Sequence, residues 1–284
     1  MINLLRNLDR RWIFLAMMLT VAIPILVQKT FPEAPTQTVR DAFDVVENLP
    51  AGSTVLMPMD YDPGSEAELK PMATAFVRHL CLRNQKIIFV TLWPNAGPLM
   101  DEIISTIVRG EFGDRYEYGR NYANLGFKSG NEMVINVIAT DLRGQFKTDK
   151  QNNPLDELEI TRSIRSVGDV QLIASVSAGT PGAKEWVQYA GTRLRVPVIA
   201  GATGVQSTQL YSYYPQQLQG LLPAIKGAAE YEALLGAKYP QYKDPTKAEA
   251  IRKMAPQLWG HLLLILLIIL GNIVYFVDRK RGRS

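Results

Sequence analysis

Cysteine and histidine are almost absent from this chain of 284 residues, which has one cysteine, Cys81, and two histidines, His79 and His261. One cysteine forms no disulfide within the chain, so cysteine usage does not reveal the compartment. Thiolate clusters are excluded, and a zinc site usually needs more cysteine and histidine ligands than the chain has. We therefore predict no metal site.

Short motifs for nucleotide binding and acyl transfer are also missing. The sequence contains no Gly-x-Gly-x-x-Gly, no Walker A motif and no Gly-x-Ser-x-Gly. Residues 179–182 and 201–204 are small-residue turns whose backbone amides could approach an anion at a helix start, but neither matches a phosphate-binding motif. The cofactor stays unknown. No array of basic and aromatic residues indicates a nucleic-acid partner.

Hydrophobic residues are plentiful but unevenly distributed. They make up 47% of the chain, charged residues make up 20% and the formal net charge is +4, a composition that permits a substantial core and argues against disorder. Apolar residues concentrate in one block near each end, whereas the middle resembles a soluble domain. The ends and the middle therefore need separate explanations.

The block near the C-terminus gives the strongest signal in the sequence. Residues 258–277 contain no Asp, Glu, Lys or Arg, and Trp259 and Tyr275 lie near the two ends, as interfacial aromatics do. This pattern predicts a transmembrane helix, with a buried helix of a soluble domain as the alternative. His261 lies inside the span, where an ionisable group is a functional candidate, yet its place near the helix end lets it reach the interface.

The block near the N-terminus, residues 12–28, is barely long enough to cross a bilayer. A basic segment before a short apolar stretch also fits a cleaved signal peptide, but residues 28–32 lack the small side chains that a signal peptidase requires. We therefore expect an uncleaved anchor. Pro24 is tolerated in a membrane helix and predicts a kink.

Basic residues on the outer flanks predict the orientation of both spans. The positive-inside tendency puts both termini in the cytoplasm, so a two-pass protein of the cell membrane holds its middle domain outside. Lys247, Arg252 and Lys253 precede the second span and weaken this asymmetry, which leaves the inverted arrangement as an alternative. The basic flanking residues are Arg6, Arg10, Arg11, Arg279, Lys280, Arg281 and Arg283.

The middle of the chain alternates apolar, strand-like runs with amphipathic helices. Residues 54–59 and 86–92 fit buried strands, and apolar positions recur every three or four residues from Leu69 to Leu80. Strand, helix, strand, helix predicts parallel pairing with helical crossovers. We predict a flavodoxin-like or Rossmann-like three-layer α/β domain of about five strands, with residues 144–154 as an exposed polar loop and residues 218–235 as a helix.

The predicted organisation follows from these elements. It comprises a cytoplasmic tail (1–11), a transmembrane helix (12–28), a stalk (29–51), an extracytoplasmic α/β domain (52–240), a juxtamembrane helix (241–257), a second transmembrane helix (258–277) and a basic cytoplasmic tail (278–284).

Polar side chains follow most of the predicted strands. In an open parallel sheet the loops at the carboxyl ends of the strands meet at one edge, where ligands bind. This rule predicts a rim suited to a small polar ligand, although any α/β domain has polar loops there. The predicted rim consists of Asp60, Tyr61, Asp62, Trp93, Asn95, Asn124, Ser177, Thr180, Thr203, Gln206 and Ser207.

Asp60 and Asp62 carry the most specific chemical signal of this rim. Their spacing after a hydrophobic strand resembles the paired aspartates of haloacid dehalogenase-type phosphatases, in which one carboxylate attacks phosphorus and the next acts as acid and base. The sequence offers no convincing downstream lysine and acidic metal ligands. The alternative is an acidic turn that caps the following helix.

The leading functional hypothesis is non-enzymatic. Two anchors fix a domain above the bilayer, as expected for a receptor-like or scaffolding subunit that binds a small polar ligand or a protein within a membrane complex. The predicted partners are the lipid bilayer and other membrane subunits or a second copy of the chain. The alternative is a membrane-tethered hydrolase or phosphotransferase that uses Asp60 and Asp62.

Overall fold

The structure is a computed structural model that describes residues 9–27, 34–130 and 132–280. It divides into two compact units, Glu33–Ala250 and a second unit made of Met1–Pro32 and Ile251–Ser284. Parts of both predicted cytoplasmic tails, position 28 of the first predicted span and the beginning of the predicted stalk lie outside the described residues.

A single six-stranded parallel sheet forms the centre of the larger unit, with the strand order β3-β2-β1-β4-β5-β6. The middle strands β1 and β4 pair directly, with Val55 opposite Leu172 and Asp60 opposite Ser177. Both are buried along their whole length, which explains why they appear in the sequence as continuous apolar runs. The predicted parallel α/β fold is confirmed. The strands are β1 (Thr54–Asp60), β2 (Lys86–Thr91), β3 (Tyr122–Phe127), β4 (Leu172–Ser177), β5 (Val198–Ala202) and β6 (Gly220–Pro223).

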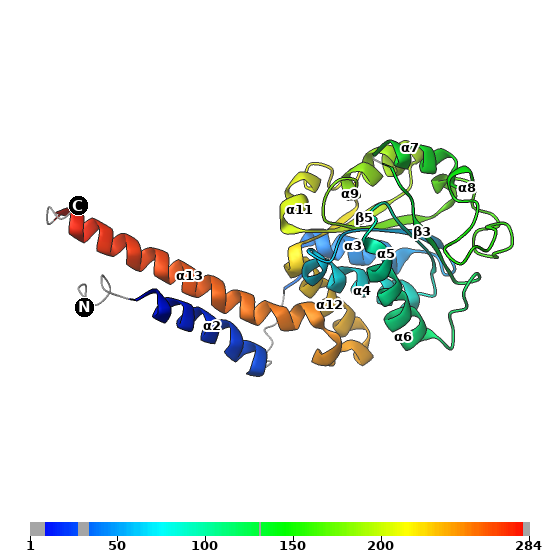
Figure 1. Cartoon of the computed structure of the whole chain (residues 1–284). Coiled ribbons are helices and arrows are strands. Elements are labelled where there is room, and N and C mark those ends of the chain that lie inside the picture. Colours follow the sequence, from blue (N-terminus) through cyan, green and yellow to red (C-terminus); the bar gives the residue numbers. More distant parts are fainter. Residues whose placement is uncertain (1–8, 28–33, 131, 281–284) are drawn as a thin grey trace. The chain divides into compact units, whose positions relative to one another are not determined.

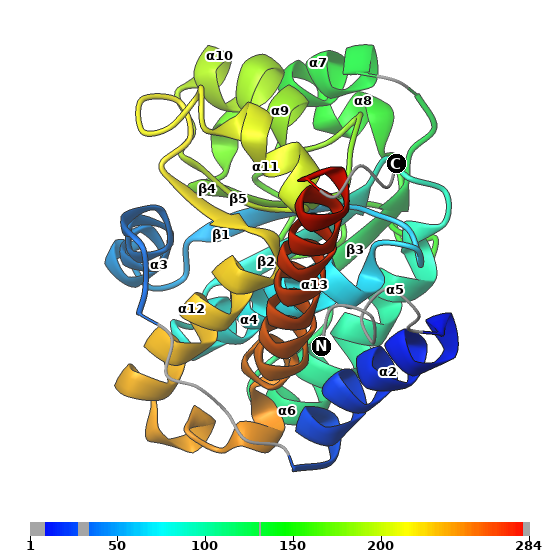
Figure 2. The same cartoon turned by 90° about the vertical axis from the view of Figure 1, so that its left-hand side faces the viewer.

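Helices cover both faces of the sheet and complete three layers (Figures 1 and 2). One face carries α3 (Gln37–Asn48), α4 (Glu66–Leu82), α5 (Ala96–Ile103), the π-helix η1 (Ile104–Arg109), α6 (Gly110–Phe112) and α12 (Ala224–Lys238). The other face carries α7 (Glu132–Thr140), α8 (Leu142–Gln145), α9 (Ala183–Glu185), the π-helix η3 (Trp186–Gly191), α10 (Thr192–Leu194) and α11 (Gly204–Leu210).

The sixth strand was not expected from the sequence. Residues 218–235 were predicted as one helix, but the chain forms β6 and only then α12, with Leu221 paired to Ala200 of β5. A four-residue apolar run is too short for its periodicity to separate a strand from a helix. Gly220 is required here because a Cβ at this position would lie 2.3 Å from the Cα of Ala42 in α3.

The helix α3 belongs to the compact α/β unit. Val39, Ala42, Phe43 and Val46 form its buried face, and the helix packs against β6. The second half of the predicted stalk is therefore part of the domain, and α3 covers an edge strand of the sheet.

Among the residues that the structure describes, two helices are long and apolar enough to cross a membrane, α2 (Arg10–Val27) and α13 (Glu249–Lys280). Their large side chains are exposed, with Leu26 81% and Ile268 62% accessible, whereas the apolar helix of a soluble core would be buried. The helix α13 begins within the predicted juxtamembrane segment, whose earlier part forms the short 3₁₀ turns η4 (Pro240–Tyr242) and η5 (Pro245–Lys247).

Candidate functional site

Asp60 lies at the carboxyl end of β1 and is completely buried. One carboxylate oxygen accepts a hydrogen bond from the Leu92 backbone N–H at 2.7 Å, and the other accepts one from the Trp186 indole N–H at 2.9 Å. The Thr91 hydroxyl lies 3.4 Å from the first oxygen. Burial raises the pKa of Asp60 to about 7, against the hydrogen bonds from Leu92, Trp186 and Thr91, which lower it.

This carboxylate joins three segments at the point where the strand order reverses. Parallel sheets of this order usually bind ligands in the crevice between the loops that follow the two middle strands. Here the Ala178 N–H donates to the Asp60 carbonyl oxygen at 3.0 Å, and the Trp93 indole N–H donates to the Pro181 carbonyl oxygen at 2.8 Å. The loops after β1, β2 and β4 are thus tied to one another by the domain's own groups.

The two residues after Asp60 are Tyr61, which is buried in the domain, and Asp62, which bonds to the start of the next helix. Tyr61 is fully buried, its hydroxyl has no hydrogen bond to any described residue, and burial raises its pKa. An Asp62 carboxylate oxygen accepts hydrogen bonds from the backbone N–H and the hydroxyl of Ser65, both at 3.1 Å. Asp62 therefore forms the acidic turn that leads into α4.

The predicted rim residues at the end of β4 and after β5 form a second closed network. The Ser177 hydroxyl donates to Gln206 Oε1 at 2.7 Å and accepts from the Ala183 N–H at 2.9 Å. Gln206 Nε2 donates to the Gly179 carbonyl oxygen at 2.7 Å, and Thr203 caps the start of α11. These residues lie close together, and their hydrogen bonds are made to one another and to the backbone of the domain.

Carboxylates of the protein also occupy the helix starts at this edge. Glu185 accepts a hydrogen bond from the Gly182 N–H at 2.9 Å, before α9, and Glu68 accepts one from the Gly204 N–H at 2.9 Å, at the start of α11. An anion at a helix N-terminus is stabilised by the free amides and the helix dipole. Because internal carboxylates already fill these positions, the edge offers little to a phosphate group.

The remaining rim residues divide between the edge and another location. Asn95 and Thr180 are exposed in the loops after β2 and β4, and Ser207 donates to the Gly204 carbonyl oxygen of its own helix at 3.0 Å. Asn124, on β3, faces a different part of the domain. The described residues contain no group of three or more His, Cys, Asp or Glu side chains placed to hold a metal ion.

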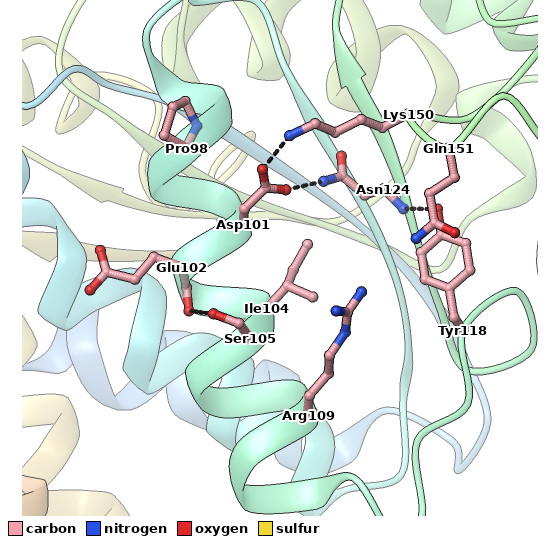
Figure 3. Close-up of a pocket in the computed structure, with 10 residues that line it drawn as sticks. All are labelled: Pro98, Asp101, Glu102, Ile104, Ser105, Arg109, Tyr118, Asn124, Lys150 and Gln151. Atoms are coloured by element: carbon pink, nitrogen blue, oxygen red, sulfur yellow. Dashed lines mark hydrogen bonds and ion pairs between the residues drawn. The ribbon is translucent and has the colours of Figure 1, made fainter.

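A cavity of about 520 Å³ lies beside the edge strand β3, and sequence reasoning missed it except for Asn124 (Figure 3). One wall is a single face of the continuous α5 and η1 helix, on which the polar positions recur at intervals of three or four residues. The opposite wall comes from the segment before β3, from β3 itself and from a distant turn. The lining residues are Pro98, Asp101, Glu102, Ile104, Ser105, Arg109, Tyr118, Asn124, Lys150 and Gln151.

Hydrogen bonds connect the two walls across the cavity. Asn124 Nδ2 donates to Asp101 Oδ1 at 3.0 Å, and the Lys150 ammonium pairs with the other carboxylate oxygen of Asp101 (Figure 3). Asn124 Oδ1 accepts the Gly126 N–H at 2.8 Å, and the Asn124 carbonyl oxygen accepts the Lys150 N–H at 2.8 Å. The amide orientation and the distance between the walls are therefore fixed before any ligand arrives.

The turn that carries Lys150 and Gln151 is built around Asp149, which is almost fully buried. Its Oδ1 accepts backbone N–H groups of Gln151 and Asn153, both at 2.8 Å, and its Oδ2 accepts the Tyr118 hydroxyl at 2.6 Å. One carboxylate thus shapes the turn and orients an aromatic ring of the cavity. The sequence indicates only a polar loop here, although Asp149, Asn152 and Asn153 are residue types common in turns.

No protein-family model matches the sequence, and no curated protein matches it. Among solved structures, the chain has a weak match to an alpha,alpha-trehalose 6-phosphate synthase from Burkholderia multivorans, with 14% sequence identity and a TM-score of 0.31. The match covers 85% of this chain and 47% of that protein, so the chain spans about half the length of the synthase.

Proposed function

We propose that the protein is a membrane-anchored subunit whose α/β domain acts by binding, as a receptor-like or scaffolding module, rather than by catalysis at the carboxyl edge of its sheet. Its occupant is a small polar ligand or a protein partner within a membrane complex.

This proposal rests on one observation: the polar groups at the carboxyl edge of the sheet already form hydrogen bonds with other groups of the domain. A nucleophile or a general base must reach its substrate. Both Asp60 carboxylate oxygens accept hydrogen bonds from the domain, and the residue has no exposed surface. The nearby helix starts hold Glu68 and Glu185 in place of a ligand's anion.

The two apolar helices support anchoring at both ends of the domain. Arg10 and Arg11 begin α2, and Arg279 and Lys280 end α13, so we propose that both termini are cytoplasmic and that the domain lies outside the cell membrane. Protease added to intact cells should then degrade residues 34–250. Protection of this segment in intact cells, with cleavage after lysis, would support the inverted arrangement.

Purification in a mild detergent tests the binding role. We expect the full-length chain to retain a stoichiometric membrane partner or to form a defined oligomer through crosslinking and size-exclusion chromatography. A monodisperse monomer without partner or ligand would contradict the proposal.

A membrane-tethered hydrolase or phosphotransferase is the second candidate, and the pKa of Asp60 near 7 favours it because perturbed carboxyl groups gather at reaction centres. Phosphatase and esterase assays, with and without magnesium, separate the two functions. If the enzyme hypothesis holds, activity is present and Asp60→Asn abolishes it while Asp62→Asn reduces it. Absence of activity in the wild type supports the binding role.

A further inference from the structure

The guanidinium of Arg109 lines the cavity beside β3, and only part of it is hydrogen-bonded within the domain. Its Nε donates to the Tyr122 hydroxyl at 3.0 Å, whereas its two terminal nitrogens have no hydrogen bond to any described residue. In Figure 3 the guanidinium points toward the space between the helix and β3. A guanidinium held in this way presents two parallel N–H groups, the arrangement that binds a carboxylate in a bidentate manner.

The charges around Arg109 favour a single negative charge on the ligand. Asp101 pairs with Lys150, and Glu102 pairs with Lys70 at 2.6 Å, so each carboxylate of the lining already has a cation. Among the side chains that line the cavity, Arg109 is the cation without a carboxylate partner. A single negative charge on the ligand would pair with this guanidinium, whereas a second charge would find no unpaired cation among the lining side chains.

The rest of the lining suits hydroxyl groups. The Gln151 amide has no side-chain hydrogen bond to a described residue, and the Ser105 hydroxyl, which donates to the Glu102 carbonyl oxygen at 2.9 Å, can still accept a hydrogen bond. Asn124 keeps one amide N–H beyond its bond to Asp101, and Tyr118 supplies an aromatic ring whose hydroxyl is held by Asp149. The volume of about 520 Å³ is in the ordinary range for small-molecule sites. Because Asp149 and Asn124 fix both walls in advance, little ordering of the protein is needed on binding.

We infer that this cavity binds a small monocarboxylate that carries hydroxyl groups, a compound of the sugar-acid class, with its carboxylate on the guanidinium of Arg109. The inference rests on the proposed binding function and names a ligand class and a place for it. The place is separate from the carboxyl edge that the sequence indicated.

Calorimetric titration of the full-length protein in mild detergent tests this assignment. Glucuronate is the probe, with glucose as the uncharged analogue and glucose 6-phosphate as the more highly charged one. We expect glucuronate to bind at least about tenfold more tightly than either analogue, because glucose has no charge to pair with Arg109 and the second charge of glucose 6-phosphate has no unpaired cation in the lining.

Variants at Arg109 make the test specific. Arg109→Gln should weaken glucuronate binding at least about tenfold, and Arg109→Lys, which keeps the charge but loses the fork, should weaken it several-fold. Arg162→Gln removes the same charge from an exposed side chain outside the cavity and should leave binding unchanged. Circular dichroism confirms that each variant is folded, and Arg109→Lys decides the matter if Arg109→Gln unfolds.

Equal binding of glucose and glucuronate, wild-type affinity in Arg109→Gln, or no binding of glucuronate would overturn the inference. The proposed function fails separately. If a membrane partner co-purifies but glucuronate does not bind, only the ligand assignment is wrong. If glucuronate binds and phosphatase activity that depends on Asp60 is found, the ligand assignment stands and the non-catalytic role does not.

Discussion

His79 Nε2 lies 3.0 Å from Glu47 Oε1 in the helical layer formed by α3, α4 and α12, where the histidine is completely buried. Its Nδ1 lies 2.6 Å from the Tyr231 hydroxyl. A neutral imidazole that donates from Nε2 to Glu47 and accepts the tyrosine proton at Nδ1 satisfies all three groups. The imidazole of His79 is therefore held in one tautomer.

The pH dependence of stability should show this arrangement. Burial lowers the pKa of His79 to about 4, below its ordinary value of 6.5, so the unfolded chain takes up a proton between these pH values that the folded chain refuses. The contribution of neutral His79 is complete above pH 6.5 and is lost as the pH falls toward 4. Its loss amounts to about 2–3 kcal/mol.

Asp60 acts in the opposite sense, because a raised pKa favours the folded state as the pH falls from 7 toward 4. The test therefore compares how the free energy of unfolding changes with pH in a His79 variant and in the wild type. Urea unfolding at pH 7 and pH 5 should show a smaller loss of stability on acidification in His79→Gln than in the wild type. Identical pH slopes in the two chains would contradict the prediction.

Asp60→Asn should lower the free energy of unfolding by about 2–3 kcal/mol at pH 8, because the new amide nitrogen meets N–H donors where an acceptor is required. Asp62→Asn keeps an acceptor oxygen for Ser65 and should cost less than about 1 kcal/mol. Chemical denaturation of the two variants checks this. Equal costs would mean that the buried hydrogen bonds of Asp60 contribute little.

Tyr61→Phe should leave stability unchanged or raise it by up to about 1 kcal/mol, since it removes a buried hydroxyl that has no described partner. Tyr116→Phe is the matched control, because its hydroxyl donates to the Gln85 carbonyl oxygen at 2.8 Å. That variant should lose about 1 kcal/mol. A clear loss of stability in Tyr61→Phe would reveal a bonded hydroxyl.

Gly220→Ala should destabilise the domain by about 3 kcal/mol or prevent folding, because the added methyl group would overlap the backbone of Ala42. Gly97→Ala is a suitable comparison within the same domain. No atom lies within 4 Å of the Cβ that it would add in α5, so it should be neutral or stabilising by up to about 1 kcal/mol. Thermal unfolding of both variants measures the difference.

The sequence predicted the fold where the periodicity was long and failed where it was short. The run from Thr54 to Asp60 and the stripe of α4 are each determined by their own residues. The strand β6 forms because its four residues pair with β5 at Ala200 and pack against α3 at Ala42. These contacts are tertiary, so the local sequence does not contain them. Local patterns could not distinguish it from the start of α12.

The candidate sites show the same limit. The topology rule placed Asp60 and Ser177 at one edge, and they do lie opposite each other on β1 and β4. The rule could not predict that Trp186, which lies more than a hundred residues further along the chain, would donate a hydrogen bond to the carboxylate of Asp60. The cavity beside β3 depends on Asp101, Asn124 and Asp149, which are separated in sequence and become neighbours only after folding.

The cover over both borders of the sheet has a consequence for assembly. At β3 the Lys150 N–H bonds to the Asn124 carbonyl oxygen, and at β6 the helix α3 lies against the strand. Uncovered border strands recruit foreign strands and start aggregation. Both edge strands are contacted by other segments of their own chain, so a strand added by a second copy would have to displace or avoid those segments.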